Sequence, residues 1–261
     1  MKYLFIDASE NLTHVQTGTE RDFNAKTIDT NRDFAAKITE ICDNMLKEAG
    51  WQKEDLTHLV VCTGPGSLTG LRVADGFLRT LAMLLNIPLI GIDLFKWSVK
   101  TLSDKGFEGE ARLVMPTLID KAFEVKCNIS NNTSLRAEGV AIQNELEVRD
   151  KSQEARDMFC DNDSSCQNRH CEPKAWQSSK IGLISKPVLI EKKDISSSIK
   201  TFGIRWSHES AERLDPTPEA LHKLIVEEAP TSKAGIDEIL KVLPLYIIPS
   251  QAERNFKGGD K

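Results

Sequence analysis

Short apolar runs alternate with amphipathic stretches along the N-terminal part of the chain. Three runs are rich in apolar and β-branched residues and have the length of buried strands: Tyr3–Ile6, His58–Cys62 and Pro88–Ile92. Apolar positions recur at helical spacing in two longer stretches, residues 31–49 and 72–86. Strands that alternate with helices predict an α/β protein whose sheet is mixed or parallel. The residues between the first run and Asp29, in contrast, are polar and weakly patterned.

Residues 31–49 predict a helix with a single apolar face. That face is formed by Phe34, Ile38, Ile41, Met45 and Ala49. We expect Thr30 or Asn31 to cap the helix, because side-chain oxygens there can accept from free backbone N–H groups. Gly50 is expected to end it.

Residues 72–86 predict a helix that is apolar around most of its circumference. One face is formed by Val73, Phe77, Leu81, Leu84 and Leu85, and it is extended by Ala74, Leu78, Ala82 and Met83. Asp75 and Arg79 are four residues apart and can pair on its polar stripe. Such a helix must be covered on two sides, one of them by its own sheet. The other cover is either the helix at 31–49 or another protein chain.

The second half of the chain is less regular. Residues 149–185 are dominated by polar and charged side chains, which predicts a flexible insert with little buried surface. A helix is expected from about Asp215 to Glu228, closed by Pro230, and a last strand at Leu245–Ile248.

A glycine-rich turn stands between the strand at 58–62 and the helix at 72–86. Its sequence is Gly64-Pro65-Gly66-Ser67-Leu68-Thr69-Gly70. Thr69 occupies the place where both a Walker loop and a dinucleotide fingerprint need glycine. Ser67 lacks the flanking glycines of a nucleophile elbow. A turn at a helix N-terminus can hold an anion, or it can simply reverse the chain.

The nine residues Gly64–Arg72, followed by an apolar helix and Ile87–Ile92, resemble the TsaB family of tRNA threonylcarbamoyladenosine biosynthesis proteins. Weaker matches lie at Leu4–Ser9, Leu118–Val125 and Leu243–Ile247. The resemblance implies an α/β, two-lobed actin-like fold (ASKHA, ribonuclease H-like) with mixed sheets flanked by helices. The lobes are expected at residues 1–100 and 101–261, with the insert in the second. A short echo of Phe5–Ala8 in Leu118–Ala122 agrees with two related lobes.

The resemblance also implies a function. The chain is expected to be a non-catalytic subunit that binds and activates a catalytic homologue, TsaD, so that the threonylcarbamoyl group forms on the adenosine next to the anticodon. The ATPase TsaE is expected to join the larger complex. The chain is expected to contact tRNA only through its partners, and it can form a homodimer when it is alone. The alternative is an ATP-dependent kinase or phosphotransferase of the same fold, which nucleotide binding would reveal. A peptidase has no support from a nucleophile–base pair or a metal pair.

Three groups of candidate site residues follow. The turn, as an anion or partner contact, contributes Gly64, Gly66, Ser67, Thr69, Gly70 and Arg72. The resemblance implies that the two helices dock on the partner through Phe34, Ile38, Ile41, Met45, Val73, Phe77, Leu78 and Leu81. The third group is a degraded nucleotide cleft at Asp7 and Ser9.

The degraded cleft rests on the residues after the first strand. Asp7 is followed by Ala8-Ser9-Glu10, which offers no glycine for close phosphate approach and adds a negative charge. The simpler interpretation is that Asp7 hydrogen-bonds the turn after its strand. Arg72 is expected in the first turn of its helix, where its charge opposes the dipole, so we expect an ion pair or a ligand there.

Composition narrows the remaining possibilities. A net charge of −5 argues against a nucleic-acid binder that acts alone. The apolar run at Tyr3–Ile6 is too short for a signal peptide, and the longest apolar segment, Leu81–Ile92, is interrupted and too short to span a bilayer. Six cysteines without a secretory signal then indicate reduced thiols in the cytoplasm. Cys160, Cys166, His170 and Cys171 cluster in the insert, but their spacing fits no standard zinc pattern. We therefore expect neither a metal nor a cofactor.

Overall fold

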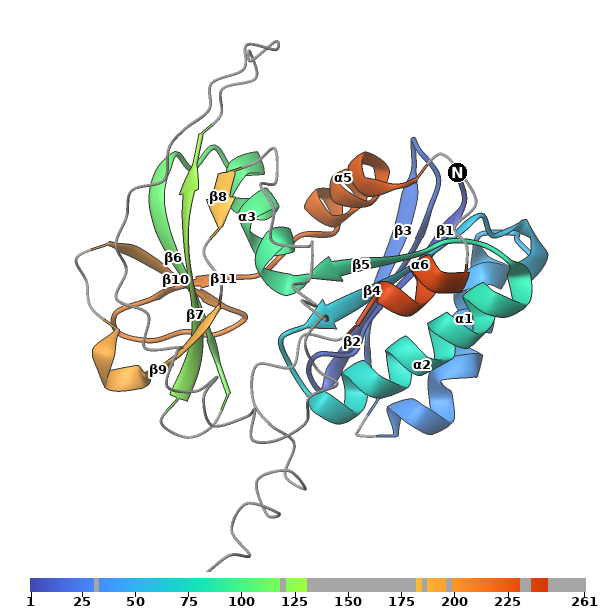
Figure 1. Cartoon of the computed structure of the whole chain (residues 1–261), viewed down its shortest axis with the longest axis horizontal. Coiled ribbons are helices and arrows are strands. Elements are labelled where there is room, and N and C mark those ends of the chain that lie inside the picture. Colours follow the sequence, from blue (N-terminus) through green and yellow to red (C-terminus); the bar gives the residue numbers. More distant parts are fainter. Residues whose placement is uncertain are drawn as a thin grey trace, which may run out of the picture. The chain divides into compact units, whose positions relative to one another are not determined.

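The computed structural model describes residues 1–30, 33–117, 121–130, 182–184, 187–195, 199–230 and 236–243. These residues form two mixed sheets with flanking helices (Figure 1). The strands of the first sheet lie in the order β3-β2-β1-β4-β5 and are β1 (Tyr3–Asp7), β2 (Leu12–Gly18), β3 (Phe23–Asp29), β4 (His58–Gly64) and β5 (Leu89–Asp93). β1, β4 and β5 run parallel, whereas β2 is antiparallel to both of its neighbours.

The hairpin of β2 and β3 was not predicted from the sequence. Most of β2 is buried, and the buried side chains include the polar residues Thr13, Gln16 and Thr17. These polar residues conceal the alternation by which a strand is usually recognised. β3 is the edge strand, and none of its residues is fully buried.

Two helices cover one face of the first sheet. They are α1 (Phe34–Glu48) and α2 (Leu68–Leu85). Their buried residues join those of β1 and β4 in one cluster, which also includes Ile239 from the short helix α6 (Ile236–Lys241). Figure 1 shows α6 beside α2. Much of the wide apolar surface of α2 is therefore covered by its sheet, by α1 and by α6, all from the same chain.

The ends of these helices differ from the prediction. Asp33 occupies the N-cap of α1 without a side-chain hydrogen bond, so the expected cap at Thr30 is wrong, and Asn31 lies outside the described residues. Gly50, with φ +70°, follows α1 as expected, and its N–H donates to the carbonyl of Lys47. α2 begins four residues earlier than predicted, inside the glycine turn, and Arg72 therefore lies in its second turn.

The other face of the first sheet is covered by α3 (Leu94–Asp104) and α5 (Pro218–Glu228). Phe5 of β1 meets Trp97 of α3 edge to face, with ring centroids 5.7 Å apart. The Trp97 Nε1–H donates to the carbonyl of Thr217 at 2.7 Å. Thr217 also caps α5, because its hydroxyl accepts from the N–H of Ala220. α5 therefore confirms the helix predicted up to Glu228.

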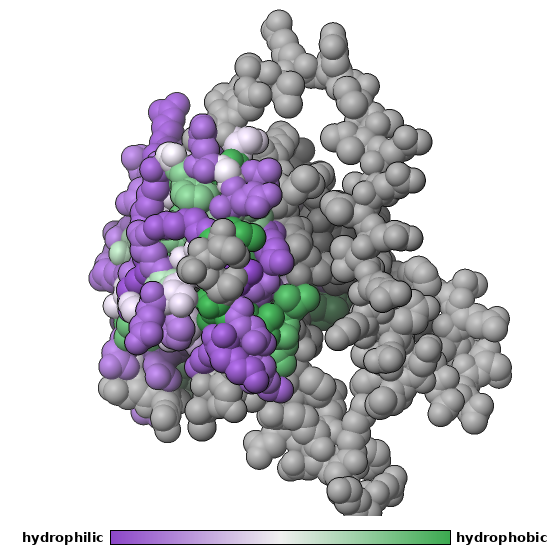
Figure 2. Space-filling view, turned by 90° about the vertical axis from the view of Figure 1, so that its left-hand side faces the viewer, coloured by the Kyte–Doolittle hydropathy of each residue, from purple (hydrophilic) through white to green (hydrophobic). Residues whose placement is uncertain are grey.

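The second sheet follows in the chain. Its strands are β6 (Gly109–Pro116), β7 (Lys121–Ile129), β8 (Gly182–Ile184), β9 (Val188–Glu191), β10 (Lys200–Ile204) and β11 (Glu212–Leu214). The order is β11-β10-β6-β7-β8, and β9 also pairs with β7. Short 3₁₀ helices lie at Lys53–Asp55 and Lys192–Asp194. Figure 2 shows the face at the left of Figure 1, and the described residues on that face are mostly hydrophilic, with a smaller apolar area.

Two mixed sheets with flanking helices confirm the α/β architecture. The strand expected at 245–248 lies outside the described residues, as does most of the insert expected at 149–185, of which Gly182–Ile184 forms β8. Among the described residues, we find no helix with the length and apolar character that a membrane span requires.

Candidate functional site

The end of β1 holds a buried ion pair. Asp7 is fully buried, and its Oδ1 accepts a hydrogen bond from the N–H of Ser9 at 2.9 Å. Its Oδ2 accepts from Nη2 of Arg205 at 2.7 Å. Nη1 of the same guanidinium donates to the hydroxyl of Ser9 at 3.2 Å. The hydrogen bond from Ser9 to Asp7 is the turn contact that the simpler interpretation of Asp7 predicted. The sequence did not indicate the ion pair with Arg205.

Both members of this pair are held in their charged forms. Burial alone would raise the pKa of Asp7, but Arg205, the nearby His14 and the hydrogen bonds together lower it below its ordinary value. Burial alone would lower the pKa of Arg205. The Asp7 carboxylate outweighs this effect and raises the pKa of the guanidinium above its ordinary value. A carboxylate that is already neutralised by a fixed cation has little remaining charge to attract a metal ion or a metal-bound phosphate.

Arg205 is itself held firmly. It follows β10 with a left-handed backbone (φ +52°), and its N–H donates to the carbonyl of Leu214 at 2.8 Å. The guanidinium carbon lies 5.3 Å from the centre of the Trp97 ring, within the range of a cation–π contact. Its side chain is only 6% exposed. Because Arg205 and Asp7 are 198 positions apart, no local motif could have shown that they meet.

The glycine turn packs directly against the turn after β1. The N–H of Ser67 donates to the carbonyl of Ser9 at 2.6 Å. A Cβ atom on Gly66 would lie 2.4 Å from that carbonyl oxygen, and a Cβ on Gly70 would lie 2.0 Å from the oxygen of Ala8. Only glycine permits such close backbone approach. Packing within the chain therefore explains why glycine is needed at positions 66 and 70.

The same turn begins α2. Ser67 is the N-cap, and its hydroxyl accepts from the N–H of Gly70 at 3.4 Å. Its carbonyl accepts from the N–H of Leu71 at 2.9 Å. Gly64, with φ +100°, allows the chain to leave β4. Two of the N–H groups that an anion at this turn could use, those of Ser67 and Gly70, thus already have partners in the protein. Thr69 and Arg72 are exposed at its surface.

The candidate docking residues fall into two sets. The α1 residues Phe34, Ile38, Ile41 and Met45 and the α2 residue Leu78 are buried in the core cluster of the chain itself. Val73, Phe77 and Leu81 are half-buried beside that cluster. On the outside of α2, Met83 and Leu84 are 43% and 78% exposed. Asp75 and Arg79 form the predicted pair at 2.9 Å, and Arg79 Nη1 also donates to the carbonyl of Ile239 in α6.

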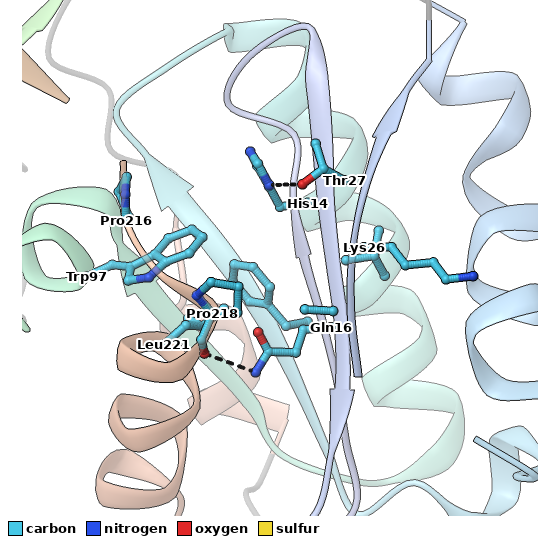
Figure 3. Close-up of a pocket in the computed structure, with 11 residues that line it drawn as sticks. His14, Gln16, Lys26, Thr27, Trp97, Pro216, Pro218 and Leu221 are labelled. Atoms are coloured by element: carbon cyan, nitrogen blue, oxygen red, sulfur yellow. Dashed lines mark hydrogen bonds between the residues drawn. The ribbon is translucent and has the colours of Figure 1, made fainter. Parts of the chain in front are cut away.

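A small pocket of about 150 Å³ lies between β2, β3, α3 and α5 (Figure 3). His14 Nδ1 is 2.8 Å from the hydroxyl of Thr27, and Gln16 Nε2 donates to the hydroxyl of Tyr3 at 2.7 Å. Burial, reinforced by Arg205, lowers the pKa of His14, so its imidazole is neutral near pH 7. Figure 3 shows the side chain of Lys26 pointing away from the other labelled residues, and its Nζ pairs with Glu48. The pocket lining is therefore mostly apolar, and His14, Gln16 and Thr27 supply its polar side chains.

Within the described ranges, no group of three His, Cys, Asp or Glu side chains could hold a metal ion. Cys42, Cys62 and Cys127 are buried free thiols, and burial raises the pKa of Cys42 to about 12. The cysteine–histidine cluster at Cys160–Cys171 lies outside the described residues.

Sequence similarity relates the chain to tRNA-modification proteins. A family model described as TsaD, tRNA N6-adenosine threonylcarbamoyltransferase, matches residues 28–108, which include α1, the glycine turn and α2. The chain is 28% identical over 92 residues to the tRNA threonylcarbamoyladenosine biosynthesis protein TsaB of Escherichia coli (strain K12), a match that covers 35% of the chain and 40% of that protein. It is 35% identical over 68 residues to TsaB of Bacillus subtilis (strain 168), covering 25% and 28%. The matches span less than half the length of these curated relatives.

Two solved structures are similar over almost the whole chain. YeaZ from Pseudomonas aeruginosa has a TM-score of 0.61 at 13% identity and covers 94% of this chain and 99% of that one. A structure described as an uncharacterized protein with similarity to peptidase YeaZ, from the same organism, has a TM-score of 0.61 at 12% identity, covering 95% and 99%. At these identities the likeness concerns the fold, and it confirms the two-lobed, actin-like architecture.

Proposed function

We propose that this chain, a divergent relative of the TsaB proteins, is a non-catalytic subunit needed to form the threonylcarbamoyl group on the adenosine next to the anticodon of tRNAs. It acts by binding and activating a catalytic homologue, TsaD, which catalyses the transfer. The observation that carries this proposal is the similarity to TsaB proteins together with the TsaD family match at residues 28–108. TsaE joins the larger complex, and the chain forms a homodimer when its partner is absent.

The geometry of the cleft supports a role without catalysis. Arg205 neutralises the Asp7 carboxylate, and the glycine turn packs on Ala8 and Ser9. A nucleotide phosphate at this place would have to displace a buried guanidinium and separate two turns in close backbone contact. Both changes cost free energy, because they leave buried polar groups without partners.

The proposed docking surface is the outer side of α2. Leu84 is exposed and lies on the same face of the helix as the half-buried Phe77 and Leu81, and Met83 is a second exposed apolar side chain of α2. Apolar anchors surrounded by less important contacts are typical of protein interfaces. The net charge of −5 agrees with contact to tRNA through the partner rather than directly.

Reconstitution with purified proteins tests the proposal. The chain is mixed with TsaD and TsaE of the same organism, and threonylcarbamoyl transfer to tRNA is measured with and without it. We expect a complex on size-exclusion chromatography and transfer that depends on the chain. Transfer at the full rate without the chain would refute the proposal.

Calorimetry with ATP and magnesium distinguishes the alternative, a kinase or phosphotransferase. We expect no binding by the isolated chain. A dissociation constant of about 1 μM, equivalent to about −8 kcal/mol, would favour the alternative.

A further inference from the structure

A continuous series of hydrogen bonds joins the second sheet to the N-terminus of α2. The guanidinium of Arg205 donates to Asp7 at 2.7 Å and to the hydroxyl of Ser9 at 3.2 Å. The other oxygen of Asp7 accepts from the N–H of Ser9. The carbonyl of Ser9 accepts from the N–H of Ser67, whose hydroxyl accepts from the N–H of Gly70. We call this series, Arg205–Asp7–Ser9–Ser67–Gly70, the relay. Each residue in it holds the position of the next through a hydrogen bond.

Burial leaves the relay little freedom. Asp7 is 0% and Ser9 is 2% exposed, so water cannot easily replace a lost protein partner. At the other end, Gly66 and Gly70 leave no room between the two turns. A displacement of Ser9 must therefore displace Ser67 as well, and with it the first turn of α2.

Arg205 is positioned by contacts outside the first sheet. Its backbone is bonded to Leu214 of β11, and its side chain lies over Trp97 of α3. Trp97 in turn donates to Thr217, the cap of α5. The guanidinium thus links the turn after β10 to the end of β1. The exposed ion pairs elsewhere, such as Lys200 with Glu212, are not buried in this way.

We propose that Arg205 is a positioning residue for α2, which it holds, through Asp7 and Ser9, in the orientation that the catalytic partner recognises. Its part in partner binding rests on the proposed function. The relay itself does not, because it can be measured in the isolated chain. A buried ion pair gives little net stability for its cost, but it can specify one geometry among several.

Hydrogen exchange of the isolated, folded protein tests the relay. In Arg205→Gln we expect the amides of Ser67 and Gly70 to exchange about tenfold faster or more, because their local opening becomes easier. The amides of β7 keep their wild-type rates. The matched control is Lys200→Gln, which removes a positive charge from an exposed ion pair on β10 and should change neither region. Unchanged exchange at Ser67 and Gly70, or a uniform increase over both sheets, would overturn the proposal.

Ser9→Ala provides a second variant in case Arg205→Gln does not fold. It removes the hydroxyl that accepts from Nη1 of Arg205 and leaves the Asp7 contact in place. We expect a smaller increase in exchange at the same two amides, and no increase would again overturn the proposal.

Partner binding completes the test. The dissociation constant of the complex with TsaD should rise about tenfold or more in Arg205→Gln, a loss of about 1.4 kcal/mol, and stay unchanged in Lys200→Gln. Faster exchange with unchanged affinity would contradict the positioning role. If the wild-type chain does not bind TsaD at all, the proposed function fails, whereas the exchange result still decides the relay.

Discussion

The carboxylate of Asp7 and the guanidinium of Arg205 meet at 2.7 Å, although 198 positions separate the two residues in the chain. The contact ties the end of β1 to the turn after β10, and it lies where a nucleotide cleft was expected to be degraded. A carboxylate that this contact neutralises needs no metal ion to be stable in the interior. The pair thus gives a physical reason to expect that this site binds no nucleotide.

Removing one partner of this pair should destabilise the protein more than removing both. Asp7→Ala leaves the guanidinium buried with a single acceptor, and we expect it to lower the free energy of unfolding by about 3–5 kcal/mol. The double variant Asp7→Ala with Arg205→Met should lose less, because no charge stays buried. Urea denaturation measures both.

Glu212→Ala is the control, since it breaks the exposed pair with Lys200 and should leave the free energy of unfolding almost unchanged. Equal losses in Asp7→Ala and Glu212→Ala would show that the Asp7–Arg205 contact is not held as described.

Two glycines of α2 should respond oppositely to the same substitution. A methyl group on Gly70 would meet the carbonyl oxygen of Ala8 at 2.0 Å, so Gly70→Ala should destabilise the protein clearly. At Gly76 the added Cβ has no atom within 4 Å, and Gly76→Ala should stabilise the helix by about 0.5–1 kcal/mol. Thermal unfolding of the two variants measures both effects. A stable Gly70→Ala protein would mean that the two turns are not packed together.

The N-cap of α3 should make stability depend on pH. Asp93 accepts from the N–H of Lys96 at 2.8 Å, and burial raises the pKa of its carboxyl to about 6. Between about pH 4 and pH 6 the folded protein therefore keeps a proton on Asp93 that the unfolded chain has lost. The free energy of unfolding falls as the pH rises through this range.

Asp93→Asn keeps the cap without the buried charge. It should raise the free energy of unfolding at pH 7 by about 1–3 kcal/mol and flatten its dependence on pH between about 4 and 6. Urea unfolding at several pH values measures this. A variant that is less stable than the wild type at pH 7 would show that the ionised carboxylate is needed.

The inward and outward sides of α2 should separate folding from partner binding. Leu78 is fully buried, so Leu78→Asp places an unpaired charge in the core and should unfold the chain. Leu84 is 78% exposed, and Leu84→Asp should leave a folded protein that no longer binds TsaD. Circular dichroism and size-exclusion binding measure the two effects.

Val226→Asp, at an exposed apolar position on α5, is the matched control for Leu84→Asp and should bind normally. If Leu84→Asp still forms the complex, the outer side of α2 is not the docking surface.

The sequence predicted those features that depend on neighbouring residues. Helical spacing located α1 to within three residues, and the strong apolar runs located β1, β4 and β5. β2 was missed because Thr13, Gln16 and Thr17 are buried polar residues in a strand. Arg205 was missed because its role depends on a residue in the other sheet. The close approach of Gly70 to Ala8 could not be predicted either, since a glycine in a turn is equally typical of a left-handed backbone.

The most direct test of the central claim is the amount of threonylcarbamoyladenosine in tRNA from cells of the native organism. The gene for the chain is silenced, and the nucleosides of the digested tRNA are measured by mass spectrometry. We predict that the modified nucleoside falls to a small fraction of its normal amount and returns when the wild-type chain is supplied, but not when Leu84→Asp is supplied. An unchanged amount after the chain has disappeared would contradict the proposed function.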